Sequence, residues 1–480
     1  MRTVTLRLAE YTLATVALLL PSEKAACAQT PFLSQAEIEL WKKRILVGPY
    51  QDDWSKRILP RAKVFRTAPE SDTWEGNQVN RPWDGYAVMN HLQLPNRHPG
   101  RTRGDGLRDA GLVYAVSGDT SYRDAVRQAL LSQASIIGTD FGNRVKWDPS
   151  SQELHNNNFE IVNWLRKLAY GYAYIRSNLS SQDRETIDHF FLDAATHWDG
   201  RINNIIKAIF PNRYQDDYKL PQVPYNPGSA KGLTHYGGYN VYSFNNGWMN
   251  IPATTNAMVA VVGILLDNSA LKDHAKRFVK EWLMFNVSPD GTVVDQFRWN
   301  DDGDPTRGYM YAGTVIGSIV ATADCLARAG DTELYRYTAS AGFYGWEGGP
   351  KSLLLVLRRF ANITIGERQL GGGVIIYASK DSNLLPSKII GPGDHKIQDT
   401  YLAPANLYYK DPIIKKSYTR SLPSSPWSGG YDSWGGDWGT SSGIRFLFGQ
   451  SEDIVWPYPS TVTTSPPSSL PEDQTNISVK

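Results

Sequence analysis

The stretch that decides the fold is residues 249–285, MNIPATTNAMVAVVGILLDNSALKDHAKRFVKEWLMF. Apolar residues recur at helical spacing over 249–266 and again over 271–285. Between these two runs, Asp267, Asn268 and Ser269 supply the polar residues of a short turn. The stretch therefore predicts two helices joined into a hairpin.

The same helix–turn–helix rhythm recurs along the chain. Further pairs of helices are predicted over 107–117 with 122–137, 159–177 with 185–198, and 309–329 with 333–343. Thr120 stands where a residue capping the 122–137 helix is expected. Asn156 to Asn158 read either as a cap for the 159–177 helix, which is favoured, or as a wall of the cleft. Several consecutive hairpins cannot each bury an apolar face alone, so they must stack as a solenoid or a ring. We predict a mainly α fold.

The two ends of the chain read differently from the helical part. Residues 1–28 resemble a secretory signal, with Arg2 and Arg7, an apolar run over 12–20 and a small-residue site ending at Ala28. This predicts a secreted protein, extracellular or periplasmic, with no membrane anchor. We expect one domain over 29–456, with a small irregular and β C-terminal part from about residue 366, including a strand over 373–377. Residues 457–480 are rich in Pro, Ser and Thr and are expected to be a disordered tail.

Composition limits the classes of partner. The formal net charge is +2, and +1 after loss of residues 1–28, which does not indicate a nucleic-acid-binding protein. Cys325 would then remain as the one cysteine; it lies in an apolar helical run and is expected to be a buried packing residue. The aromatic share of 12% fits a sugar-binding cleft, although core packing accounts for most rings. We expect a monomer. Four glycosylation sequons begin at Asn178, Asn286, Asn362 and Asn476.

Three segments carry polar and aromatic residues suited to chemistry. They are 234–236 (THY) through 244–248 (FNNGW), 288–292 (SPDGT) with 295–298 (DQFR), and 307–312 (RGYMYA). Taken singly, the two Asn residues favour a turn or helix cap, the Tyr residues favour core packing, and the Asp-Gly pair favours a turn. Taken together, the segments fall at successive hairpin openings, which line one rim in a ring of hairpins. Their order favours a functional site.

In this order the motifs resemble the alginate lyase superfamily, which includes related glucuronan lyases. That pattern has Asn-Asn-His before one hairpin, then Asp-Gly-Ser, an Arg, and Tyr-x-x-Tyr-Ala opening the next hairpin. The resemblance covers roughly residues 100–345. It implies an (α/α) toroid, or incomplete barrel, and a polysaccharide lyase that cleaves a uronic-acid polymer of the glucuronan or alginate type by β-elimination.

The resemblance also implies roles for single residues. Asn246 matches the Asn that neutralises the uronate carboxylate, Tyr311 matches the catalytic Tyr, and Arg307 or Arg298 matches the neighbouring Arg. The chain departs from the pattern at Gly247, where the family has His, and His235 is the candidate to supply an imidazole. The predicted substrate-binding residues are Arg298, Asn245, Trp248, Tyr309, Tyr236 and Asn158.

The chemistry of β-elimination calls for these residue types. The C5 proton of a uronate is acidic only when hydrogen-bond donors stabilise the charge that develops on the carboxylate. A base must take that proton, and an acid must protonate the leaving O4. A Tyr beside an Arg can do both, because the Arg favours the phenolate. The anionic polysaccharide is the expected partner, and no metal or other cofactor is expected.

Two other functions compete with a lyase. A glycoside hydrolase on a helical toroid would need two carboxylates flanking the scissile bond. The loop residues available for that role are Asp216, Asp217, Asp301, Asp302 and Asp304. A non-catalytic sugar-binding protein would use the aromatic rings without needing Tyr311 and Arg307 together. The reaction product separates the three, because only a lyase forms an unsaturated sugar without consuming water.

Overall fold

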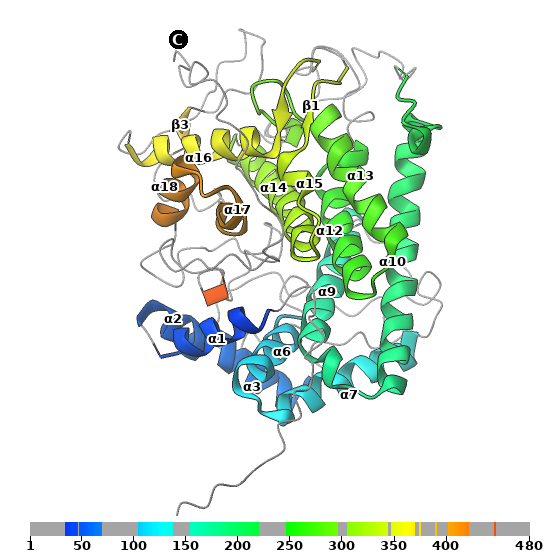
Figure 1. The fold of residues 1–480 in the computed structure, drawn as a ribbon, viewed down its shortest axis with the longest axis vertical. Coiled ribbons are helices and arrows are strands. Elements are labelled where there is room, and N and C mark those ends of the chain that lie inside the picture. Colours follow the sequence, from blue (N-terminus) through cyan, green and yellow to red (C-terminus); the bar gives the residue numbers. More distant parts are fainter. Residues whose placement is uncertain are drawn as a thin grey trace, which may run out of the picture.

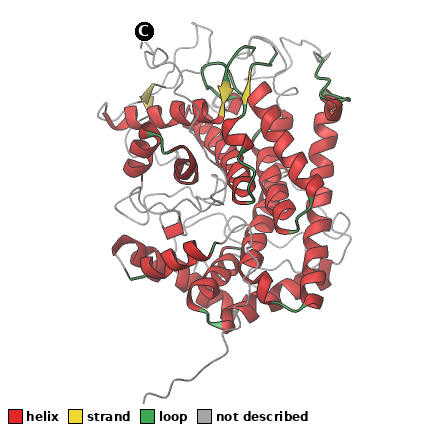
Figure 2. Ribbon diagram, in the orientation of Figure 1, coloured by secondary structure: helices red, strands yellow, loops and turns green. Residues whose placement is uncertain are grey.

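Helices account for most of the described chain (Figure 2). The computed structural model describes residues 34–46, 48–69, 104–137, 154–219, 246–295, 305–343, 347–369, 374–375, 389–390, 402–421 and 446–447. The α-helices are α1 (Gln35–Arg44), α2 (Gly48–Asp53), α3 (Leu59–Thr67), α6 (Asp105–Ser117), α7 (Thr120–Ile137), α9 (Leu154–Ile175), α10 (Ser181–Ile209), α12 (Asn250–Leu265), α13 (Ser269–Phe285), α14 (Pro305–Arg328), α15 (Glu333–Arg336), α16 (Leu353–Gln369), α17 (Leu402–Tyr409) and α18 (Pro412–Ser421).

Short elements complete the fold. The single helical turns are η1 (Trp54–Ile58, a π-helix), η3 (Arg176–Asn178), η4 (Arg213–Gln215) and η6 (Asn246–Trp248). The strands are β1 (Thr338–Ala339) paired antiparallel with β2 (Lys351–Ser352), and β3 (Val374–Ile375) paired antiparallel with β4 (Ile389–Ile390).

The helices form a curved double layer (Figure 1). Helices α6, α9, α12 and α14 contact one another in succession and form the inner layer. Their hairpin partners α7, α10 and α13 contact one another in the same order and form the outer layer. Stacking of this kind buries the apolar face that a single hairpin cannot cover. The predicted mainly α fold, an (α/α) toroid of helix hairpins, is confirmed.

Packing explains which helices lie inside. Helix α12 is apolar on every side and is buried along nearly its whole length, as expected of a helix that contacts α9, α10, α13 and α14. Helices α6 and α9 approach each other closely at two glycines. A Cβ atom at Gly111 would lie 2.6 Å from the carbonyl oxygen of Gly171. Any side chain at Gly111 would therefore push the two inner helices apart.

Two polar contacts fix the direction of α12 against α14. Thr254 Oγ1 lies 3.2 Å from Ser318 Oγ, and Asn256 Nδ2 lies 3.4 Å from Thr322 Oγ1. From the first contact to the second, the residue numbers rise in both helices. The two helices therefore run parallel and begin at the same rim of the helical layers. Asn256 also donates to the backbone oxygen of Ala275 at 3.2 Å, and α13 then returns towards that rim.

The N-terminal helices bind the far end of the chain. Glu37 in α1 forms an ion pair of 2.7 Å with Arg328, at the end of α14. The indole nitrogen of Trp41 donates to the backbone oxygen of Leu447 at 3.1 Å, and the ring of Phe446 packs against that of Trp41 at 6.5 Å. These contacts join α1 both to the inner layer and to residues 446–447.

Several helix ends differ from the prediction. Helix α9 begins at Leu154, so the expected cap at Asn158 lies inside the helix. Thr120 is already in α7, and Asp119 accepts the backbone N–H of Ser121 at 2.9 Å in its place. Helix α10 runs to Ile209 and not to 198, because its buried stripe continues through Ile202 and Ile206.

The part after α14 also differs from the prediction. Helix α15 ends at Arg336, where the chain turns into β1, so the expected helix up to 343 is not formed. The strand expected over 373–377 is confirmed in part as β3. Strands β1 and β2 precede residue 366, and α17 and α18 follow it. The region after 366 thus adds helices, and α17 packs on α14.

Burial distinguishes the sequons and the cysteine. The side chain of Asn286 has no exposed surface, so an oligosaccharide cannot be attached there in the folded protein. Asn178 and Asn362 are exposed, and Asn476 lies outside the described residues. Cys325 is buried as predicted, and burial raises the pKa of its thiol to about 12. None of the described helices has the length and apolar character needed to cross a membrane.

Candidate active site

Three described segments reach the same rim of the helical layers. Tyr311 lies in α14 seven residues before Ser318, and Gly247 lies in η6 seven residues before Thr254 of α12, the residue that Ser318 contacts. The third segment is the turn at 288–292, which follows the end of α13 where that helix returns to the rim. The rim therefore carries the parts of all three predicted motifs that the structure describes.

Tyr311 lies near the start of α14. The helix begins at Pro305, a residue favoured in the first turn because its missing N–H would have no partner there. Arg307 and Tyr311 are thus four residues apart in one helix and lie on the same face, whereas Tyr309 lies on a different face. The Tyr311 side chain is half-buried.

The turn at 288–292 is a compact hairpin. Val287 and Val293 form an antiparallel bridge, and Asp290 accepts the hydroxyl of Ser288 and the backbone N–H of Thr292. Burial raises the pKa of Asp290, but the nearby Arg359 and these hydrogen bonds outweigh burial and lower the pKa overall. The turn reading of this motif is confirmed, and Asp290 serves the turn as a carboxylate.

Trp248 connects the 246–248 turn to the protein core. Its side chain is 0% exposed, and its indole nitrogen donates to Glu281 Oε2 at 3.1 Å. The ring packs against Phe285 at 5.3 Å and Phe210 at 6.0 Å between centroids. Sequence reasoning assigned Trp248 to sugar binding. In this arrangement the indole has no exposed face to offer a sugar ring, and it anchors the turn to the core.

Gly247 has a packing reason to be glycine. A Cβ atom there would lie 3.0 Å from Ile206 Cγ1 on α10, with Ile209 and Ile205 also within 4 Å. The turn thus rests directly on the apolar surface of α10. A histidine at this position would press against the Ile206 side chain.

We expect Gly247→His to destabilise the protein by about 1–3 kcal/mol, the usual cost of overpacking. The measurement is chemical unfolding of the variant beside Gly200→His. Gly200 is the matched control. It lies in α10, the helix against which Gly247 packs, and a Cβ atom there meets nothing within 4 Å. Equal stability of the two variants would contradict the close packing of the turn on α10.

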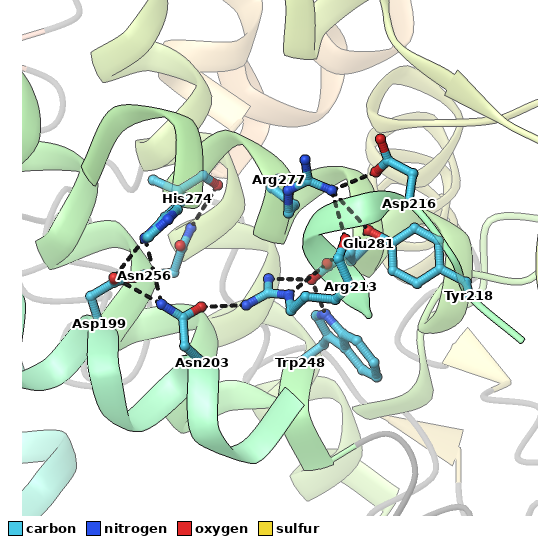
Figure 3. A network of polar contacts seen from close by, with 11 residues as sticks. Asp199, Asn203, Arg213, Asp216, Tyr218, Trp248, Asn256, His274, Arg277 and Glu281 are labelled. Carbon is cyan, nitrogen blue, oxygen red and sulfur yellow. Dashed lines mark hydrogen bonds and ion pairs between the residues drawn. The ribbon is translucent and has the colours of Figure 1, made fainter. Parts of the chain in front are cut away.

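Glu281 of α13 is the centre of a buried network beneath the rim (Figure 3). Arg213 donates to both of its oxygens, through Nε to Oε1 at 2.8 Å and through Nη2 to Oε2 at 2.5 Å. Tyr218 donates to Oε1 at 2.9 Å, and Trp248 donates to Oε2. Burial and the Glu281 carboxylate raise the pKa of Tyr218, so its hydroxyl stays a donor. Four donors from three residues, in the 210–219 segment and the 246–248 turn, thus converge on one carboxylate.

The network extends outwards along α10 and α13 (Figure 3). Arg213 Nη1 donates to Asn203 Oδ1, and Asn203 donates to Asp199 at 2.9 Å. Asp199 also lies 2.7 Å from Nδ1 of the half-exposed His274. On the other side Arg277 pairs with Asp216 at 2.5 Å and donates to the backbone oxygen of Arg213 at 2.9 Å. Residues of both α10 and α13 therefore bind the 210–219 segment.

The structure describes only some of the predicted site residues. The residues His235, Tyr236, Asn245 and Arg298 lie outside the described residues. For Asn158, Asn246, Arg307 and Tyr309 the backbone is described within helical elements, but the side chains are not. The roles predicted for these eight residues stay predictions. Tyr311 is the predicted catalytic residue whose side chain is described, and it lies at the expected rim.

Sequence reasoning missed Glu281 and Arg213. A signal for Glu281 was present, because residues 278, 281, 282 and 285 form one stripe of α13 and the other three are Phe, Trp and Phe. A carboxylate on an apolar stripe indicates a buried partner. Among the described residues, no group of three or more His, Cys, Asp or Glu side chains is arranged to hold a metal ion.

The chain was compared with family models, curated sequences and solved structures. No protein-family model matches the chain, and no curated protein matches its sequence. The fold is similar to a solved structure of alginate lyase A1-III complexed with tetrasaccharide. The TM-score is 0.42 and the sequence identity is 12%, and the match covers 76% of this chain and 92% of that one.

Proposed function

We propose that the protein is a polysaccharide lyase that cleaves a uronic-acid-containing polymer by β-elimination. The observation that carries the proposal is the parallel course of α12 and α14, which contact each other at Thr254 and Ser318. Tyr311, four residues after Arg307 in α14, and the 246–248 turn, which precedes α12, both come before this contact in their segments. With residues 1–28 read as a signal, the proposed lyase is exported and meets its polymer outside the cell.

The proposed reaction uses one tyrosine twice. The Tyr311 phenolate takes the C5 proton of the uronate, while Asn246 donates a hydrogen bond to the carboxylate on which charge develops. The C4–O4 bond then breaks, a C4–C5 double bond forms, and O4 takes the proton from the Tyr311 hydroxyl. The tyrosine ends the cycle as a phenolate, and no water is consumed.

The described carboxylates do not favour the competing hydrolase. An inverting hydrolase needs one carboxylic acid that stays protonated until it meets the leaving oxygen. Asp216 is paired with Arg277 at 2.5 Å, and Asp217 with Lys219 at 3.0 Å. The hydrogen bond from Lys219 lowers the pKa of Asp217, which favours its carboxylate form. The other three candidate Asp residues lie outside the described residues.

The test is incubation of the full chain with alginate, glucuronan and glycosaminoglycans. We expect an unsaturated product that absorbs ultraviolet light from at least one polymer, because elimination leaves a C4–C5 double bond conjugated with the carboxylate. New reducing ends without that absorbance would indicate a hydrolase. Binding without any product would indicate a sugar-binding protein. Either of these results would overturn the proposal.

A further inference from the structure

We propose that Glu281 is a positioning residue of this active site, which sets the place of Asn246 by holding Trp248. The inference rests on the proposed function for its catalytic meaning. Its structural part stands on contacts that are described in full: a buried carboxylate, its four donors and the turn that one of them carries.

Besides the packing of Gly247 on α10, the described contacts of the turn with the interior run through Trp248. η6 is a single 3₁₀ turn of three residues, and Met249, which follows it as the N-cap of α12, makes no side-chain cap hydrogen bond. Gly247 contributes no side chain to the core. The indole of Trp248 is therefore the side chain that reaches from the turn into the interior, where Glu281 accepts its N–H and Phe210 and Phe285 hold its ring.

The chemistry of the buried Glu281 carboxylate favours a single arrangement of its hydrogen-bond donors. A buried carboxylate loses its hydration, so it is tolerated only when its oxygens are supplied with donors. Here each oxygen accepts two donors, one of them from Arg213, whose planar guanidinium fixes the orientation of the carboxylate. Oε2 then has one remaining direction for the Trp248 N–H. The hydrogen bond consequently fixes the position of the turn, in addition to keeping the indole of Trp248 buried.

Asn246 receives this constraint directly. It lies two residues before Trp248 in the same helical turn, so a rotation or shift of the indole moves the backbone that carries the Asn246 side chain. A displacement of about 1 Å at a reacting group is enough to lower a rate by roughly 100-fold. A residue that does not touch the substrate can therefore control the rate through the turn.

The experiment compares Trp248→Phe with Trp282→Phe in the full chain. Both changes remove one indole N–H from a fully buried ring. Trp282 is the matched control, because it follows Glu281 on α13 and its indole nitrogen has no hydrogen-bond partner among the described residues. We expect Trp248→Phe to increase amide hydrogen exchange over 246–249 about tenfold, as expected when a hydrogen bond to a charged group is lost.

The same two variants are then assayed on the cleaved polymer. We expect Trp248→Phe to lower kcat about tenfold with KM within a factor of two, and Trp282→Phe to leave both parameters unchanged. Unchanged exchange in Trp248→Phe, or equal changes of exchange in the two variants, would overturn the inference. So would a kcat for Trp248→Phe equal to that of Trp282→Phe. A wild-type chain without unsaturated product defeats the proposed function instead, and exchange alone then decides whether Glu281 holds the turn.

Discussion

Tyr311→Phe is expected to give a folded protein that still binds its polymer and forms no unsaturated product. The change keeps the half-buried ring and removes only the hydroxyl, so the packing of α14 is preserved. The hydroxyl is the proposed base and the proposed acid, and each such role is worth about 10²–10⁴ in rate. The measurement is ultraviolet detection of product, with binding followed separately on the same polymer.

Tyr309→Phe is the control for this prediction. On a helix, positions 309 and 311 fall on different faces, so the control should retain its kcat, whereas loss of the predicted substrate contact would raise its KM. If Tyr309→Phe is inactive while Tyr311→Phe is active, the catalytic assignment moves by two residues and the mechanism stands. If both variants turn over normally, elimination by a tyrosine is wrong.

Asn246→Ala is expected to lower kcat by roughly 10²–10³-fold, the usual effect of losing one donor to a developing oxyanion. The alternative is that Asn246 only caps a helix. Asn268→Ala provides the matched control, because Asn268 caps α13 by accepting the backbone N–H of Leu271 at 3.1 Å. Loss of such a cap costs about 1 kcal/mol of stability and should leave kcat unchanged.

The comparison of the two variants separates the roles of Asn246. If Asn246→Ala loses stability as Asn268→Ala does while its kcat remains normal, the neutralising role is contradicted. If Asn246→Ala unfolds at the same denaturant concentration as the wild type and turns over slowly, the role is supported. Both outcomes are read from one unfolding curve and one rate for each variant.

The local sequence pattern predicted the helices of the chain. It did not predict the helix ends that depend on contacts with residues distant in sequence. The prediction ended the α10 helix at 198. The helix continues because Asp199 pairs with His274 and because Ile202 and Ile206 extend the buried stripe. Likewise Asp119, and not Thr120, caps α7, a difference of one residue that propensity alone does not resolve.

The candidate site shows the same limit. The start of α14 at Pro305, with Arg307 and Tyr311 one turn apart, follows from local sequence. The pairing of Glu281 with Arg213 joins residues 68 positions apart, and no local pattern chooses such a partner. A carboxylate on an apolar stripe indicates that a partner exists, but packing of the whole chain decides which residue it is.

The contacts of α1 with residues 446–447 bear on the order of folding. A ribosome makes Glu37 and Trp41 about 400 residues before Leu447, and chains of this size fold in stages as they emerge. The hairpins of the inner layer have partners close in sequence, so they are able to form during synthesis. Helix α1 cannot complete its packing until residues 446–447 have been synthesised. The first of the described helices to be synthesised is therefore expected to be among the last to reach its final packing, and a chain released early would lack the contacts of Trp41 with residues 446–447.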